Sequence, residues 1–144
     1  YKGVISQDEQ GNWLALFKPM ADEHYNGINA LCAAQLFKGL YRGLNQHRIH
    51  QLQPVLNLKI ALVSGSGDNH LLTEHAYQLS RSVEANELIT NQRLYETPTI
   101  NERVLAGGRY KKVDDDTYLI AALSSEFQNL IDRQAEHFLN PQKQ

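Results

Sequence analysis

Four of the six histidines occur in two pairs whose spacing suits metal coordination. His47 and His50 are three residues apart, so on a helix both imidazoles would share one turn, and His70 with His75 forms a looser second pair. No Cys or pair of Glu residues completes either set of ligands. We therefore expect these imidazoles to be solvated and not to hold a structural or catalytic metal ion.

Three consecutive carboxylates, Asp114, Asp115 and Asp116, lie between two β-prone stretches. Clustered carboxylates suit hard cations such as Ca2+ or Mg2+. Three adjacent residues at a hairpin tip point in different directions, however, and Asp is common in turns. An ordinary solvated turn is the favoured interpretation.

A glycine-containing break, Ser64, Gly65, Ser66, Gly67 and Asp68, lies between a predicted strand and a predicted helix. Backbone N–H groups and a helix N-terminus at such a junction can cradle a phosphate. No Lys follows the glycines, and the spacing does not match that of a Walker motif. A tight turn with a helix cap is favoured, and a ligand loop is the alternative.

Nucleophilic catalysis has weak candidates. The single cysteine, Cys32, lies in an apolar helical pattern, and no Ser occurs in a Gly-Xaa-Ser-Xaa-Gly context. We expect a buried, inert thiol. A lone cysteine cannot form an intramolecular disulfide, which favours a reducing, cytoplasmic setting.

The elements that would position these groups follow from hydrophobic period and turn residues. In chain order they are a hairpin over 2–6 and 13–17 around a turn at 8–12, a long helix over 28–44, a strand over 58–63, a helix over 72–83, a short strand over 87–90, a hairpin over 109–113 and 117–123, and a closing helix over 127–138. Residues 94–105 are ambiguous, because Pro98 interrupts any helix there. Trp13, on the first hairpin, is expected to pack in the core, with an exposed interface as the alternative.

The long helix is expected to end near Gly43 and Asn45, because both residues favour helix termini. A polar link containing His47, His50 and Pro54 would follow it. The near-continuous apolar run that comes next predicts a central strand covered on at least one face. The closing helix is expected to turn inward a face made of Phe127, Leu130, Ile131, Gln134 and Phe138.

Composition limits the class of protein. The chain has 144 residues, 42% of them hydrophobic, and a formal net charge of -2, which suits one domain, 1–144, with one substantial core. Scattered Lys and Arg residues argue against nucleic-acid binding. No run approaches the roughly 20 apolar residues of a membrane-spanning helix. Because the chain begins at Tyr1, we expect it to be the C-terminal part of a longer protein, whose other part could include a membrane anchor or a sensor.

The order of these elements resembles that of the class III adenylate and guanylate cyclase homology domain, over approximately Val4 to Tyr95. The matching stretches are Trp13–Phe17, similar to the second strand of that family's metal-binding hairpin; Ala30, Leu31, Ala33 and Ala34 in an Ala-rich helix; Leu58–Gly65, similar to a strand written Arg-Ile-Gly-Xaa-His-Xaa-Gly; Thr73–Gln78, where the family has Val-Asn-Xaa-Ala-Xaa-Arg; and Glu87–Thr90. The resemblance implies an α+β fold, an α/β sandwich of the ferredoxin-like, cyclase-homology type. Its mostly antiparallel sheet would carry helices, and its first strand would precede Tyr1.

Cyclisation in this family needs two Asp side chains that hold metal ions, so that the ribose hydroxyl can attack the α-phosphate. One Asp belongs to the strand that would precede Tyr1. Alignment backwards from Phe17 puts Gly11 at the position of the other, and Asp8 and Glu9 are close but out of register. The resemblance therefore implies a vestigial metal site in this hairpin.

Two further positions depart from the family. Its transition-state Asn and Arg correspond to Glu74 and Gln78, so the cation that would stabilise phosphate charge is replaced, and an acid there would repel a triphosphate. The arm between strand and helix is shortened to Ser66–Leu72, which removes surface that family members use to dimerise and to complete a shared active site.

These departures favour a non-catalytic, cyclase-like regulatory or protein-interaction domain of a bacterial-type signalling protein. The expected partner is a second copy, as a homodimer, or another signalling protein, and no cofactor is expected. One alternative is a divergent nucleotidyl cyclase that converts ATP or GTP to a cyclic nucleotide, with Mg2+ or Mn2+ held by Asp8 or Glu9 and residues upstream of Tyr1. Another is a nucleotide or small-ligand sensor with a pocket near residues 64–68.

Overall fold

The computed structural model describes residues 4–7, 13–16, 24–65, 69–97 and 100–140, and its fold is mixed α+β. The elements, in chain order, are β1 (Val4–Gln7), β2 (Trp13–Leu16), α1 (His24–His50), β3 (Lys59–Leu62), α2 (Asn69–Arg81), β4 (Glu87–Asn91), α3 (Gln92–Glu96), the π-helix η1 (Ile100–Leu105), β5 (Arg109–Asp114), β6 (Thr117–Ala122) and α4 (Ser125–Leu139). Both predicted hairpins and the closing helix are confirmed, and the ambiguous stretch resolves into α3 and η1. Pro98 lies outside the described residues.

The strands form two sheets. β1 and β2 pair antiparallel as a two-stranded sheet, and the other four strands have the order β3-β4-β6-β5. Of the strand pairs in the described residues, β3 with β4 is the one that runs parallel, so the predicted mostly antiparallel arrangement is confirmed. The prediction that the apolar run over 58–63 is a central strand is wrong, because β3 lies at an edge of its sheet and β4 occupies a central position.

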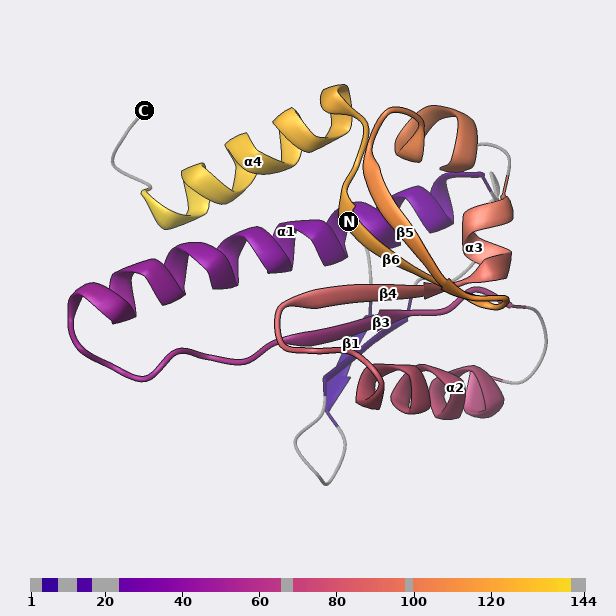
Figure 1. Ribbon diagram of the computed structural model, residues 1–144, viewed down its shortest axis with the longest axis horizontal. Helices are drawn as coiled ribbons and strands as arrows, with labels where there is room; N and C mark the ends of the chain where they lie inside the picture. The colour runs from indigo at the N-terminus through magenta and orange to yellow at the C-terminus, as the bar shows by residue number, and fades with distance from the viewer. Residues whose placement is uncertain (1–3, 8–12, 17–23, 66–68, 98–99, 141–144) are drawn as a thin grey trace.

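Helices cover both faces of the four-stranded sheet (Figure 1). α1 and α4 lie on one side, and α2 packs under β3 and β4 on the other. This explains the continuous apolar run of β3: a strand covered on two faces needs apolar residues at successive positions even at an edge. β4 is the most buried strand, with Leu88, Ile89 and Thr90 all inaccessible to solvent.

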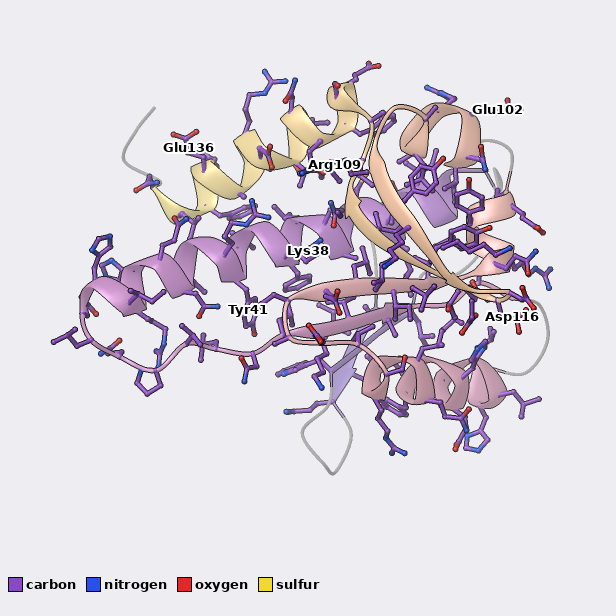
Figure 2. All side chains as sticks on the ribbon, in the orientation of Figure 1. Lys38, Tyr41, Glu102, Arg109, Asp116 and Glu136 are labelled. Carbon is purple, nitrogen blue, oxygen red and sulfur yellow. The ribbon has the colours of Figure 1, made fainter. Side chains whose placement is uncertain are left out.

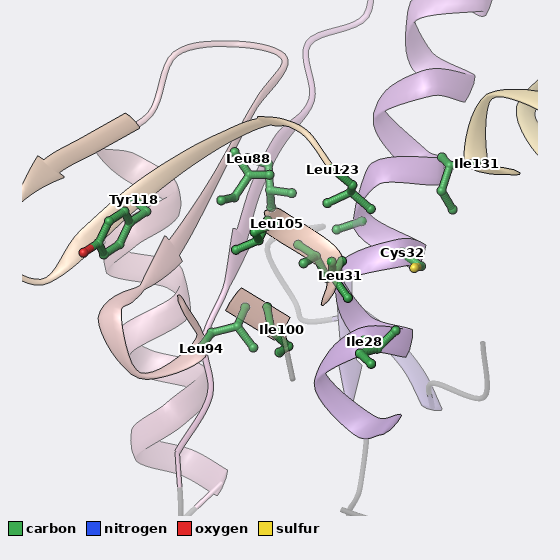
Figure 3. Close-up of a cluster of buried hydrophobic side chains, with 13 residues drawn as sticks. Ile28, Leu31, Cys32, Leu88, Leu94, Ile100, Leu105, Tyr118, Leu123 and Ile131 are labelled. Atoms are coloured by element: carbon green, nitrogen blue, oxygen red, sulfur yellow. The ribbon is translucent and has the colours of Figure 1, made fainter. Parts of the chain in front are cut away.

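One hydrophobic core lies between α1 and the sheet (Figure 3). Its most deeply buried members come from five elements: Leu31 from α1, Leu88 from β4, Ile100 from η1, Ile120 from β6 and Ile131 from α4. Each such side chain contributes about 1.5–3 kcal/mol through removal of its surface from water. The core therefore joins α1 and α4 to the four-stranded sheet.

The long helix does not end near Gly43 and Asn45, as the sequence predicts, but continues to His50. Gly43 is needed for helix packing, because a Cβ there would overlap the side chain of Leu139 on α4. The Asn45 side chain does not cap the helix and instead donates to Leu56 O (2.9 Å) and accepts from Leu56 N (2.7 Å). Both His47 and His50 consequently lie on the helix and not in a polar link.

α1 ends in a Schellman motif with a leucine in the left-handed position. Leu52 has φ of 58°, the Gln53 N–H donates to Arg48 O, and the Leu52 N–H donates to Ile49 O. This position normally favours glycine, so the residue that ends α1 carries no local signal of its own, although basic residues in the last turn and Pro54 beyond it are typical of a helix end.

The predicted inward face of α4 is only partly correct. Ile131 and Ala135 are buried against α1, whereas Leu130 is 45% exposed and Phe138 is 64% exposed. Ala135 faces Gly39 of α1, and this contact between two small residues turns the larger side chains outward. Leu44, which continues the apolar helical spacing of the predicted helix over 28–44, is also exposed, because the C-terminal half of α1 extends past the sheet (Figure 1).

Candidate functional site

The C-terminal ends of the parallel strands β3 and β4 meet at a hydrogen-bonded junction. The Asn91 side chain accepts from Ser64 N (3.2 Å) through Oδ1 and donates to Ser64 O (2.8 Å) through Nδ2. Its Oδ1 also accepts from Leu94 N (3.3 Å), which caps α3. One buried amide therefore holds the start of the β3–α2 loop against the start of α3.

A shallow, open depression lies directly beyond this junction. It is lined by Gln92, Arg93, Glu96 and Thr97 of α3 and its C-terminal end. Gln92 Nε2 donates to Glu96 Oε1 (2.5 Å), and the Gln92 N–H donates to Asp116 O (2.7 Å) of the β5–β6 turn. Ligands of open α/β sheets bind outside the carboxyl ends of strands, so this edge is the candidate site of the domain. The lining favours binding of a polar ligand and contains no arrangement for nucleophilic catalysis among the described residues.

The predicted ligand loop adjoins this site at its first two residues. Ser64 and Gly65 are half-buried, and a Cβ on Gly65 would come 2.5 Å from Leu72 Cδ2 of α2. The loop is therefore packed closely against α2 where it leaves β3. Ser66, Gly67 and Asp68 lie outside the described residues.

Glu74 and Gln78, the two positions that the resemblance assigns to transition-state residues, lie on the outer face of α2. Glu74 and Gln78 are one helical turn apart, and both side chains are exposed. The α2 stripe of Leu72, Ala76 and Leu79 faces the sheet, as the sequence predicts. Glu74 and Gln78 are thus presented to solvent from the helix face opposite the sheet.

The predicted vestigial metal site falls at the turn of the first hairpin. Asp8, Glu9 and Gly11 lie outside the described residues. On the flanking strands, Ile5 pairs with Ala15 and Gln7 with Trp13. Trp13 is 70% exposed, so the prediction that it packs in the core is wrong. The reason is that β1 and β2 form a sheet of their own, whereas the core lies between α1 and the other sheet.

The remaining metal candidates are not brought together. His47 and His50 are exposed at the end of α1, and His70 and His75 are exposed on α2. Among the described residues no group of three or more His, Cys, Asp or Glu side chains is placed to hold a metal ion. Nor do these residues include a helix with the length and apolar character to cross a membrane.

The aspartate run forms the β5–β6 turn. Asp114 Oδ1 accepts from Asp116 N (2.8 Å), and this bond is the main cause of the lowered pKa of the Asp114 carboxyl. Asp114 is fully exposed. The geometry is that of a local turn stabilised by an Asp side chain.

Three tyrosines form a cluster beside the candidate site. The rings of Tyr95 on α3 and Tyr118 on β6 stack at 3.9 Å, and Tyr95 Oη donates to Tyr110 Oη (3.3 Å) on β5. Sequence reasoning missed this cluster, because Tyr95 is joined to the β5–β6 hairpin only by tertiary packing.

Lys38 is the described cation with the most unusual surroundings (Figure 2). It projects from α1 to the end of β6, where Nζ donates to Ile120 O (3.1 Å) and Ala121 O (3.5 Å). Burial, and then the positive charge of Arg42, lower the pKa of the Lys38 ammonium group. Its bonds to main-chain oxygens tie α1 to β6, which is a structural role.

Cys32 is buried on α1, as predicted, and burial raises the pKa of its thiol to about 11. A thiol with so high a pKa is almost entirely protonated at neutral pH and is a poor nucleophile.

No protein-family model matches the chain, and no curated protein matches it. The resemblance to class III cyclases therefore stays a hypothesis that depends on the matching stretches of the sequence.

Proposed function

We propose that the protein is a non-catalytic, cyclase-like regulatory domain that acts as a cytoplasmic protein-interaction module. The observation that carries the proposal is the apolar face of the first hairpin. Ile5 and Trp13 lie on the same face of the β1–β2 pair, and both are exposed. Neighbouring apolar side chains exposed on one face mark interaction sites on proteins, since their burial in a complex is favourable.

The residues at the family's catalytic positions support a non-catalytic role. Glu74 places a carboxylate, and Gln78 a neutral amide, where a cyclase would use an amide and a guanidinium. The acid would repel a triphosphate, and loss of the cation removes stabilisation of the charge that develops on phosphate.

The interaction role is tested by self-association of the purified chain. Light scattering over a range of concentrations is expected to show a dimer that Trp13→Ser converts to a monomer. Leu71→Ser is the matched control, because Leu71 is 67% exposed but lies on α2. A chain that stays monomeric at high concentration, or a dimer insensitive to Trp13→Ser, would count against a homodimer formed through the hairpin.

Catalysis is tested separately. The proposal predicts no cyclic nucleotide from ATP or GTP in the presence of Mn2+ or Mg2+. Metal-dependent turnover that Asp8→Ala with Glu9→Ala abolishes would establish the divergent cyclase and overturn the non-catalytic role.

A sensor is the second candidate function, and the depression beyond Asn91 favours it. Its lining is polar, and it adjoins Ser64 at the carboxyl ends of β3 and β4. A ligand that binds only the folded chain must raise the unfolding temperature, so thermal-shift measurements with nucleotides test it. A shift in unfolding temperature that Glu96→Gln changes, while Glu84→Gln in the connection between α2 and β4 does not, would support binding at this depression.

A further inference from the structure

A second apolar surface lies on the long helix. Phe37, Tyr41 and Leu44 of α1 are spaced at i, i+4 and i+7, so they form one stripe about 10 Å long, at 1.5 Å per residue. Phe37 is 48% exposed, Leu44 is 43% exposed and Tyr41 is half-buried. We call these three residues the α1 flank.

The α1 flank lies away from α4, the helix that packs beside α1. Gly39 and Gly43 contact α4, and at 3.6 residues per turn the flank is roughly 150° around the helix from them. Figure 2 shows Tyr41 on the side of α1 that faces away from α4. α1 therefore has a helix packed along one flank and, among the described residues, none along the other.

The charged side chains that α1 and the segment after it carry are all basic, and one acid, Glu87 of β4, lies opposite Lys59 and acts on Lys38. α1 contains no Asp or Glu, and neither does the segment 51–63 that follows it. Arg48 continues the stripe by one turn, where its Nε donates to Pro54 O (2.6 Å) and fixes the side chain. A second copy of α1 would bring like charges together, whereas a partner with carboxylates beside its apolar residues would be attracted.

From this complementarity we infer that the α1 flank docks an amphipathic helix of another protein, which carries acidic residues next to its apolar stripe. The helix would pack beside α1 as α4 does on the other flank, with an acidic side chain at the Arg48 end. The inference rests on the protein-interaction part of the proposed function and is independent of the cyclase-like fold.

The test uses the whole chain and two designed helical peptides. In both peptides Leu residues are spaced alternately three and four positions apart, so that they form one apolar stripe. The residues beside this stripe are Glu in one peptide and Lys in the other. Fluorescence anisotropy is expected to show binding of the Glu-flanked peptide only. Phe37→Ser with Leu44→Ser should weaken this binding by at least about tenfold, because these side chains form the apolar contact.

Matched controls exist on α4, where Leu130 and Phe138 are exposed to a similar or greater extent. Leu130→Ser with Phe138→Ser should leave the peptide affinity unchanged, and circular dichroism of both double variants checks that they fold. Arg48→Gln should narrow the preference for the Glu-flanked peptide over the Lys-flanked one.

Four results would overturn the inference. The first two concern the peptide: the Glu-flanked peptide does not bind, or the α4 double variant loses as much peptide affinity as the α1 double variant. The other two concern other occupants: the chain self-associates and the α1 double variant abolishes this, or the α1 flank binds phosphatidylserine vesicles while the chain binds no peptide. These results can be told apart from failure of the proposed function. That function is tested by nucleotide turnover and by the effect of Trp13→Ser on dimer formation. A functional cyclase could still bind the peptide, and a non-catalytic dimer could fail to bind it.

Discussion

Asn91→Ala should destabilise the protein by about 2–3 kcal/mol. The substitution removes three hydrogen bonds, two with the main chain of Ser64 and one with Leu94 N. Each hydrogen bond contributes about 1 kcal/mol net to the stability of the fold. In the variant, water can reach the half-buried Ser64 and bond to its main chain, which offsets part of the lost stability. Asn91 itself is 9% exposed, so its removal also leaves a small void at the junction of β3, β4 and α3.

Urea unfolding followed by circular dichroism measures this effect. For a chain of this size the midpoint should fall by about 1 M without a change in the slope of the transition. Asn101→Ala is the control, because Asn101 makes one long bond, from Nδ2 to Tyr95 O (3.3 Å), and should cost less than about 1 kcal/mol. If Asn91→Ala cost no more than Asn101→Ala, the Asn91 amide would not hold the loop, and the candidate site would lose its structural basis.

Three further predictions concern the frame around the site. Cys32, with a pKa of about 11, should have roughly one thousandth of its thiol ionised at pH 8 and should react with iodoacetamide only after unfolding. Leu52→Gly should be more stable than Leu52→Ala by about 1 kcal/mol in urea unfolding, because the left-handed backbone strains any residue with a Cβ; equal stability would contradict this. Gly108→Ala should unfold or strongly destabilise the chain, since its Cβ would overlap the main chain at Ala122 and Leu123, and a wild-type melting temperature would refute the packing.

Periodicity and turn residues predict most of the elements because those signals are local. The β5–β6 hairpin and the buried face of α2 follow from alternation, helical spacing and the Asp-rich turn alone. The end of α1 could not be predicted in this way. Gly43 resembles a helix stop but is needed for contact with Leu139, and the left-handed residue that ends the helix is Leu52.

The candidate site was predictable only in part. A glycine-containing break after a buried strand indicates a loop at the carboxyl edge of the sheet, and Ser64 and Gly65 do lie there. The residue that holds this loop, Asn91, is 27 positions further along the chain and has no local feature that distinguishes it from other turn residues. The exposure of Trp13 could not be predicted either, because an apolar strand has the same pattern whether a second layer covers it or not.

Two asparagines act alike on β3 and bear on both proposals. Asn91 pairs with the N–H and C=O of Ser64, and Asn45 pairs in the same way with Leu56, so a side-chain amide binds the main chain beyond each end of β3. An edge strand with one neighbour would otherwise fray at its ends. The two amides therefore fix the backbone just before and just after β3. Asn45 directly follows Leu44 of the α1 flank, so its two bonds to Leu56 order the backbone next to that flank, and little order has to be gained when a partner docks there.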